Sequence, residues 1–221
     1  MRHLPEEEKA KIQQEIQEFK TEKMQFDRQV DCYDDHSNDI IVLAKKMCLI
    51  MMQMTDFTRG TGPLKTTNDV ITAAQKIAQY GTELNKLANE IAIACPDPST
   101  KDDLKAYLSK IIALSHQLTM CAQVKAEVQQ ITGGEMVVTG IDGATSLIQA
   151  AKNLMSAVVS SVKYSYVAST QAKRTGQQDG PIIVWKMKAP EKKPLIRKSD
   201  KNKGMVQNKG ATRRGHRGGE D

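Results

Sequence analysis

The segment from about Asp39 to Phe57 is apolar on nearly every side of a helix, and no other feature constrains the fold as strongly. Its apolar residues point in all directions around a helical wheel: Ile40, Ile41, Val42, Leu43, Met47, Leu49, Ile50, Met51 and Met52. Lys45 and Lys46 interrupt the run, and the segment is too short to span a bilayer. A helix that is apolar all round needs neighbours on several sides. We therefore expect a central helix in a bundle of more than three helices.

Two more helices are predicted, one before this segment and one after it. The first spans residues from about 6 to 32. It begins with a run of glutamates directly after Pro5, and both features favour a helix N-terminus. The apolar stripe of this helix is interrupted only by Lys23, whose long stem can lie along the edge of a core. Residues 67–94 repeat small and apolar side chains over three heptads, which predicts a continuous packing seam.

The last two predicted helices span about 100–131 and 143–173. Ser99 and Asp102 have the spacing of a capping box for the former, and Asp142 is a candidate cap for the latter. Short turns separate the five helices, and three of the four contain Gly or Pro, which favours an antiparallel arrangement. The predicted fold is therefore an all-α, antiparallel five-helix bundle over residues 1–180.

The predicted helix from 100 to 131 carries more apolar surface than one packing seam needs. Its first stripe comprises Leu104, Leu108, Ile111, Ser115, Leu118 and Ala122. Met120 and Val124 lie together on another face, in line with Ala113 and Gln117. One interpretation is a second packing neighbour for this helix. The other is an exposed apolar strip, flanked by Lys125, that binds a partner.

Residues 181–221 form a basic C-terminal region without helical periodicity. They hold twelve Lys and Arg against four acidic residues, whereas the first 39 residues hold six basic and eleven acidic side chains. Such a polycation is compatible with three partners: nucleic-acid phosphates, anionic lipid headgroups, or an acidic protein surface such as a filament. Arg213, Arg214 and Arg217 stand among glycines, which is typical of RNA-binding segments. Composition does not separate these partners.

Enzymatic and metal-binding motifs are missing from the sequence. It has no Gly-rich phosphate loop, no H-E-x-x-H, no C-x-x-C and no G-x-S-x-G. Among the four histidines only His116 lies on a predicted helix, where a polar surface position explains it. The four cysteines have no paired spacing, and no apolar leader follows Met1, so we expect reduced thiols in a cytoplasmic protein. We expect neither an enzyme, nor a cofactor, nor a metal site.

Several long strings of residues resemble the α-catenins, within the vinculin family. They are Asn38-Asp-Ile-Ile-Val-Leu-Ala-Lys45, Met54-Thr-Asp-Phe-Thr-Arg-Gly60, Val124-Lys-Ala-Glu-Val128, Thr145-Ser-Leu-Ile-Gln-Ala-Ala-Lys-Asn-Leu-Met155, Tyr166-Val-Ala-Ser-Thr170 and Trp185-Lys-Met-Lys-Ala-Pro-Glu-Lys-Lys-Pro194. The resemblance extends from about residue 1 to 196. It implies the C-terminal F-actin-binding domain of that family, a bundle similar to the vinculin tail. It also implies an extended strap over residues 181–196, followed by a disordered basic tail over 197–221.

The function that the resemblance implies is non-enzymatic binding of actin filaments. Family members link the cadherin–β-catenin complex to F-actin at adherens junctions, in the cytoplasm at the cell cortex. The region that binds the cadherin complex lies in upstream domains absent from this chain, so we expect a fragment of a longer protein. In the family, tension is thought to release the first helix and strengthen binding. The acidic first helix here, with Lys23 in its seam, is compatible with such release.

The resemblance assigns filament contacts to particular positions of this chain. On the predicted fourth helix they are Ala113, Met120, Val124 and Lys125, where Ala113 replaces a leucine and Met120 an isoleucine. This assignment favours the exposed interpretation of the second stripe. Gln171 stands where the family has a lysine, so Lys173 and Arg174 are expected to replace its charge. The strap contributes Trp185, Lys188, Lys192 and Lys193, and Trp185 can instead pack back on the bundle.

An alternative function uses the basic tail alone. In that case the chain is a lipid- or nucleic-acid-binding module, and Met120 and Val124 have no role in binding. Given the resemblance, we expect no nucleic-acid partner, and an anionic phosphoinositide lipid stays a second candidate partner beside F-actin.

Overall fold

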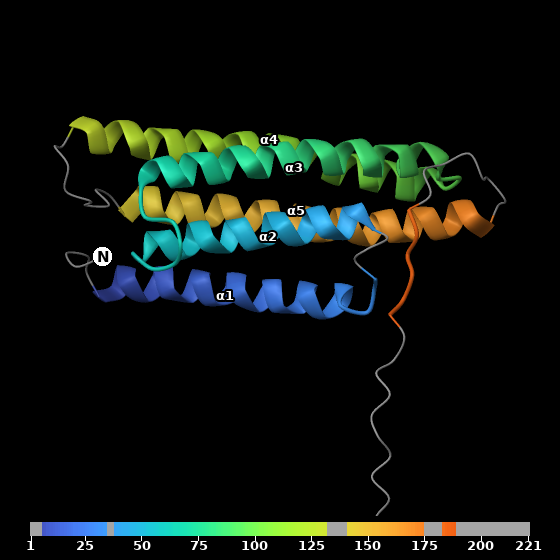
Figure 1. The fold of residues 1–221 in the computed structure, drawn as a ribbon, viewed down its shortest axis with the longest axis horizontal. Helices are drawn as coiled ribbons and strands as arrows, with labels where there is room; N and C mark the ends of the chain where they lie inside the picture. Colours follow the sequence, from blue (N-terminus) through green and yellow to red (C-terminus); the bar gives the residue numbers. More distant parts are fainter. Residues whose placement is uncertain (1–5, 35–37, 132–140, 175–182, 189–221) are drawn as a thin grey trace, which may run out of the picture. The chain divides into compact units, whose positions relative to one another are not determined.

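The described part of the chain forms five long helices, and successive helices run in opposite directions (Figure 1). The computed structural model describes residues 6–34, 38–131, 141–174 and 183–188. The helices are α1 (Glu6–Val30), α2 (Asp39–Thr58), α3 (Thr67–Ala94), α4 (Pro98–Ile131) and α5 (Ile141–Arg174). Within these residues the only β-type pairing is an isolated antiparallel bridge between Tyr33 and Met187. The predicted all-α antiparallel bundle is confirmed.

Side-chain caps explain where α2 and α3 begin. The Asn38 side chain accepts a hydrogen bond of 3.2 Å from the backbone N–H of Ile41, which satisfies one open donor of α2. Thr66 and Asp69 form a reciprocal capping box at the start of α3. Asp69 accepts backbone N–H bonds from Lys65 and Thr66, and these bonds hold the pKa of its carboxyl below 3.8.

The cap of α4 differs from the prediction. Asp97, and not Ser99, caps the helix, because its carboxylate accepts from the backbone N–H of Thr100 at 2.9 Å and from the Thr100 hydroxyl at 2.5 Å. Pro98 then occupies the first helical position, where its missing N–H costs nothing. The predicted start at residue 100 is therefore two residues late. An aspartate followed by a proline is itself a strong signal for a helix start, and the prediction did not use it.

Two other helix ends also shift by a few residues. The helix α1 ends at Val30 and not at Cys32, because the backbone of residues 32–34 pairs with a distant segment of the chain. At the other shifted end, α5 begins at Ile141, so Asp142 lies inside the first turn. The predicted turns at 132–134 and 175–180, the tail and most of the strap lie outside the described residues.

The helix α5 is the element that touches every other helix. It packs against α1, α2, α3 and α4, whereas α2 packs against α1, α3 and α5. The predicted neighbours of α2 on several sides are confirmed. Its central position is not, because Leu49 is 48% exposed and lies on a face that no helix covers. The apolar surface of α2 is therefore wider than the surface that α1, α3 and α5 cover.

The seam of α3 is buried along its whole length, as its heptads predict. It comprises Val70, Ala74, Ile77, Gly81, Leu84, Ala88 and Ile91. Gly81 permits a close approach, because a Cβ placed there would lie 3.1 Å from Cγ2 of Ile111 on α4. The packing of α3 on α4 is the most extensive helix contact among the described elements.

The helix α1 lies at the edge of the bundle and contacts only α2 and α5 (Figure 1). Its apolar stripe is buried as predicted: Ile12, Ile16, Phe19, Phe26 and Val30. The first half of the stripe belongs to a small cluster with Ala144 and Ile148, separate from the main core. Lys23 lies in the stripe half-buried and pairs with Asp27 at 2.5 Å.

Candidate functional site

The structure separates the two stripes of α4 into a buried one and an exposed one. Leu104, Leu108, Ile111, Ser115, Leu118 and Ala122 are all buried against the neighbouring helices. On the opposite side Ala113, His116, Gln117 and Met120 are exposed. Packing against α3 and α5 accounts for the first stripe, and no further helix among the described elements covers the other one.

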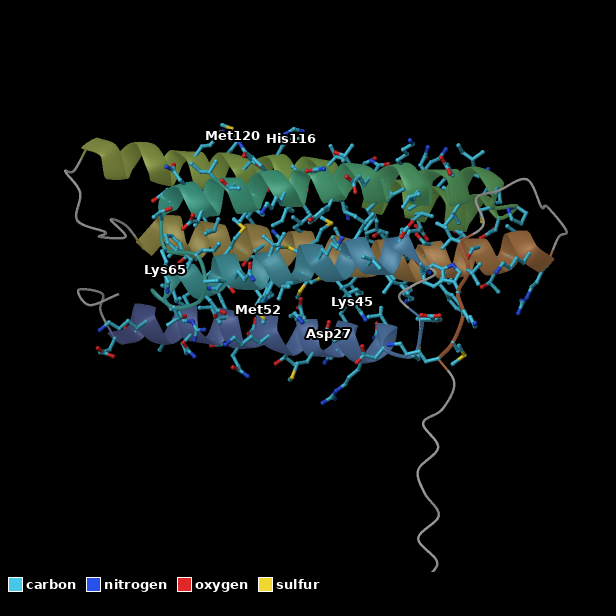
Figure 2. The ribbon with its side chains drawn as sticks, in the orientation of Figure 1. Asp27, Lys45, Met52, Lys65, His116 and Met120 are labelled. Atoms are coloured by element: carbon cyan, nitrogen blue, oxygen red, sulfur yellow. The ribbon has the colours of Figure 1, made fainter. Side chains whose placement is uncertain are left out.

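Met120 is the large apolar side chain of this exposed stripe. It is 60% exposed, and Figure 2 shows Met120 and His116 projecting from the outer side of α4. Its exposure agrees with the surface interpretation of the helical spacing. Val124 and Lys125 lie further along α4, but their side chains are outside the described residues. A solvent-facing methionine among small and polar residues is compact enough to enter an apolar pocket of a partner.

The described part of the strap, residues 183–188, pairs with the segment that follows α1. The backbone N–H of Asp34 donates to the Lys186 carbonyl, and the N–H of Lys188 donates to the Cys32 carbonyl, each at 2.7 Å. The bridge between Tyr33 and Met187 lies between these bonds. The strap therefore holds the C-terminal end of α1 through main-chain bonds that the sequence pattern does not reveal.

Trp185 packs back on the bundle within an aromatic cluster. Its ring centroid lies 5.5 Å from Tyr33 and 5.4 Å from Tyr166, both in edge-to-face geometry. The two tyrosine rings are 5.7 Å apart, and burial is the main cause that raises the pKa of Tyr33. The indole Nε1 of Trp185 is buried without a hydrogen-bond partner. In the structure Trp185 thus packs back on the bundle, and its Nε1–H does not donate a hydrogen bond.

Tyr33 is the residue of this cluster that the sequence analysis missed. It lies after a helix, where apolar side chains do not recur at a helical spacing that could identify it. The one available signal was that aromatic residues are scarce in this chain. Tyr166 appeared only within the α-catenin-like string. The contact joins residues from three distant parts of the sequence, so local pattern alone does not indicate it.

The C-terminal end of α5 presents two exposed cations. Lys173 and Arg174 lie in its last turn, where positive charge also favours the helix dipole. The nearby Gln171 contacts the turn between α3 and α4: it accepts from the Cys95 thiol at 3.2 Å and donates to the Thr100 hydroxyl at 3.4 Å. Gln171 therefore has a structural role that a lysine would not fill in the same way.

The cationic positions of the strap are only partly described. Lys188 is exposed beside the bridge to the α1 end. Lys192 and Lys193 lie outside the described residues. The structure thus brings Trp185 and Lys188 together with the end of α1, while the α4 residues form a separate group.

Ion pairs connect α1 to its two neighbours. Lys152 of α5 pairs with Glu18 at 2.5 Å, which lowers the pKa of that carboxyl below 4.5 and raises the pKa of Lys152 above 10.5. From α2, Lys45 pairs with Asp31 at 3.4 Å, just after α1, and Figure 2 shows Lys45 pointing toward α1. Asp56 of α2 lies 4.0 Å from Lys20. These contacts are partly exposed, so salt screens them.

The described region has no metal-binding cluster, and its buried thiol Cys48 is unreactive. No group of three or more His, Cys, Asp or Glu side chains there is arranged to hold a metal ion. Burial raises the pKa of the Cys48 thiol to about 12, which keeps it protonated and unreactive. No described helix is long and apolar enough to cross a bilayer.

Comparison with protein families gives one match that covers most of the chain. The sequence profile described as the vinculin family matches residues 1–193. A solved structure reported as a vinculin homologue in a sponge (phylum Porifera) has a TM-score of 0.65 at 30% identity. That match covers 84% of this chain and 23% of the sponge chain.

Curated relatives match at higher identity over the same region. The chain is 61% identical over 197 residues to catenin alpha of Drosophila melanogaster, covering 89% of this chain and 21% of that protein. It is 56% identical over 201 residues to catenin alpha-3 of Mus musculus, covering 90% and 22%. It is 47% identical over 249 aligned residues to catenin alpha-2 of Homo sapiens, covering 90% and 26%. The chain thus spans about a fifth to a quarter of the length of these relatives.

Proposed function

Because this chain belongs to the vinculin family, we propose that it is the F-actin-binding domain of an α-catenin. In this proposal it is a non-enzymatic module of the cytoplasm and cell cortex. It links the cadherin–β-catenin complex to actin filaments at adherens junctions, with upstream domains of a longer protein binding the complex. The relatives named catenin alpha, with 47–61% identity to this chain, support the proposal.

The exposed methionine on α4 is the observation that carries the filament-binding proposal. Seven large apolar side chains of the described region are exposed, and Met120, at 60%, is the one among them that belongs to α4. It lies on the one stripe of α4 that α3 and α5 do not cover. Single exposed apolar side chains are common on protein surfaces, so the weight of this observation comes from the position of Met120 on the stripe that the α-catenin resemblance assigns to the filament.

The mechanism assigns an apolar and an ionic part to the interface. Met120 and Val124 contribute the apolar contact, and Ala113 contributes less because its side chain is small. Lys125, Lys173 and Arg174, with Lys188, Lys192 and Lys193 of the strap, meet acidic residues of the filament. A few apolar residues then dominate the affinity, whereas the charges increase the association rate and make it depend on salt.

Trp185 is a further contact in this proposal. Its unpaired buried Nε1 has a donor to offer, and its half-exposed ring lies next to exposed strap residues. A filament contact through Trp185 competes with its packing between Tyr33 and Tyr166. The Trp185 side chain therefore either contacts the filament or packs against Tyr33 at the end of α1, and it does not do both at once.

Co-sedimentation with actin filaments tests the proposal. We expect Met120→Ala with Val124→Ala to weaken binding about tenfold or more, because the apolar part of the interface is lost. The matched control is Met24→Ala, which removes a methionine of similar exposure, 52%, from α1. It should bind like the unchanged chain. Circular dichroism verifies that each variant is folded.

A truncation after Ile196 distinguishes the proposal from the alternative function of the basic tail. The truncated chain should keep most of its filament affinity. If it loses binding while the Met120 and Val124 variant keeps it, the polycationic tail is the binding element and the α4 contacts are wrong. Anionic vesicles and RNA then become the partners to test.

We also propose that binding is sensitive to tension through release of α1. This helix contacts only α2 and α5, part of its apolar stripe lies in a small separate cluster, and exposed ion pairs contribute to its attachment. Elements with few buried contacts open at lower free energy than the rest of a fold. Amide hydrogen exchange should accordingly be faster in α1 than in α3, and equal protection of the two helices would contradict release.

A further inference from the structure

We propose that Met120 is an oxidation site through which peroxides regulate filament binding. The proposal rests on the proposed function, because it assigns a regulatory modification to the same α4 surface. Oxidation of the thioether to the sulfoxide weakens binding, and reduction of the sulfoxide restores it. The fold itself is unaffected by this change.

The positions of the methionines limit which of them a dissolved oxidant can reach. Met47, Met51, Met54 and Met155 are completely buried, so a dissolved oxidant does not reach them in the folded chain. Among the described methionines, Met24, Met120 and Met187 are exposed at 52%, 60% and 68%. Figure 2 shows Met120 on the outer side of α4. Of the three exposed methionines, Met120 alone lies on the α4 stripe.

The oxidation step needs only a hydroperoxide as co-reactant. The Met120 sulfur donates an electron pair to one peroxide oxygen, the S–O bond forms and the O–O bond breaks. The sulfur is oxidised by two electrons, and the second oxygen leaves as hydroxide or alkoxide. The oxygen now bonded to sulfur releases its proton, which the leaving oxygen takes up to give water or an alcohol. Sulfoxide reductases reverse the change at the expense of thiols.

The consequence of the step follows from the two environments of the side chain. In the unbound chain the sulfoxide oxygen is hydrated, because the side chain is mostly exposed. In an apolar contact the same oxygen is removed from water without a partner, which is unfavourable. Oxidation of Met120 therefore weakens binding by roughly tenfold without unfolding the bundle.

Thiols are the main competing targets for a peroxide. Cys32 is exposed, whereas Cys48 is buried and its thiol has a pKa of about 12. Reversible thiol products are reduced by dithiothreitol, which leaves methionine sulfoxide intact. Treatment with dithiothreitol after oxidation therefore separates the two chemistries.

The experiment measures co-sedimentation with untreated filaments after the chain has been oxidised with hydrogen peroxide, freed of peroxide and reduced with dithiothreitol. Peptide mass spectrometry determines the sulfoxide at each methionine. The oxidised chain should bind roughly tenfold more weakly, and methionine sulfoxide reductases should restore its affinity. Met120→Ile, which keeps the apolar volume and lacks sulfur, should bind equally well before and after oxidation. Met24→Leu with Met187→Leu should remain sensitive.

The outcomes separate this proposal from the filament-binding proposal. Equal loss of affinity in the unchanged chain and in Met120→Ile would overturn regulation at Met120. Unchanged affinity with a high content of sulfoxide at Met120, or resistance of Met120 to a peroxide that oxidises Met24, would overturn it as well. If the unoxidised Met120→Ala, Val124→Ala variant loses binding in these cases, the filament-binding site stands and only its oxidation is refuted.

Discussion

At the scale of the residue, Gly81 determines how closely α3 and α4 approach. The seam that it occupies was visible as a heptad repeat, but the reason for a glycine in that repeat was not. A Cβ at this position would lie 3.1 Å from Cγ2 of Ile111 and 3.3 Å from Oγ of Ser115. Both atoms belong to the buried stripe of α4. The glycine therefore permits this close approach of α3 and α4 and forgoes the higher helix propensity of alanine.

A larger side chain at this position should destabilise the bundle. We expect Gly81→Val to lower the free energy of unfolding by about 1–3 kcal/mol, because the added methyl groups force α3 and α4 apart. Urea denaturation followed by circular dichroism measures the change. Thr82→Val introduces the same residue one position later, on the exposed side of α3, and should have little effect. Equal stability of the two variants would show that the helices adjust to the extra volume.

At the scale of the element, α1 is attached differently from the other helices. Phe19, Phe26 and Val30 join the main core, but Ile12 and Ile16 contact α5 through a separate cluster with Ala144 and Ile148. Lys152 and Lys45 add ion pairs to Glu18 and Asp31, respectively. Charge and a small apolar cluster thus contribute more to the attachment of α1 than to the contact between α3 and α4.

Removal of these ion pairs should loosen α1 selectively. In Lys152→Gln with Lys45→Gln, amide exchange of α1 should become severalfold faster, with little change in α3 and α4, because the pairs bridge to α1 alone. Lys76→Gln with Lys86→Gln removes two exposed lysines from α3 and serves as the charge-matched control. The salt dependence of α1 exchange should also be smaller in the double variant. Faster exchange throughout the bundle would instead indicate global destabilisation.

The α2 helix shows where reasoning from a single element fails. Its apolar residues predicted several neighbours, and α1, α3 and α5 supply them. The same pattern placed α2 at the centre, which is wrong because Leu49 is exposed and α5 touches all four other helices. Periodicity describes which sides of a helix avoid water, whereas the number of neighbours depends on how all five helices pack.

At the scale of the whole molecule, carboxylates connect the stability of the bundle to pH. Backbone N–H bonds from Lys65 and Thr66 lower the pKa of Asp69, and the Thr100 hydroxyl and N–H lower that of Asp97, both from 3.8. Lys152 lowers the pKa of Glu18 from 4.5. Because each pKa is lower in the folded chain, each ionised group stabilises the fold fully above its unfolded value. The contribution is lost as the pH falls through the folded value.

Acidification should therefore destabilise the bundle below about pH 4.5, where the unfolded chain begins to bind these protons first. Asp69→Asn with Asp97→Asn should be less stable than the unchanged chain at pH 7 and lose less stability on acidification. Urea denaturation between pH 7 and pH 3 measures both slopes. The control is Glu90→Gln, an exposed position in the interior of α3 that caps no helix. Parallel curves for the unchanged chain and the double variant would contradict the assignment.

The sequence by itself determined the features that depend on neighbouring residues. Five helices and the buried seam of α3 follow from spacing, because burial in a helix repeats every three or four residues. Spacing also marked Met120 as part of a second stripe on α4, but it left open whether a helix covers that stripe, and only the resemblance favoured its exposure. The proposed binding surface comes from the α-catenin resemblance and stays a prediction. Its residues Val124, Lys125, Lys192 and Lys193 stay predictions, since their side chains are outside the described part of the chain.

Only the tertiary structure decided the features that join distant parts of the chain. It placed Trp185 between Tyr33 and Tyr166, paired residues 186–188 with 32–34, and tied Gln171 to the turn before α4 and to the first turn of α4. It also showed that α5 contacts every other helix while α1 contacts only two. These contacts depend on how five amphipathic helices share one core, and the periodicity of each helix carries no information about its partners.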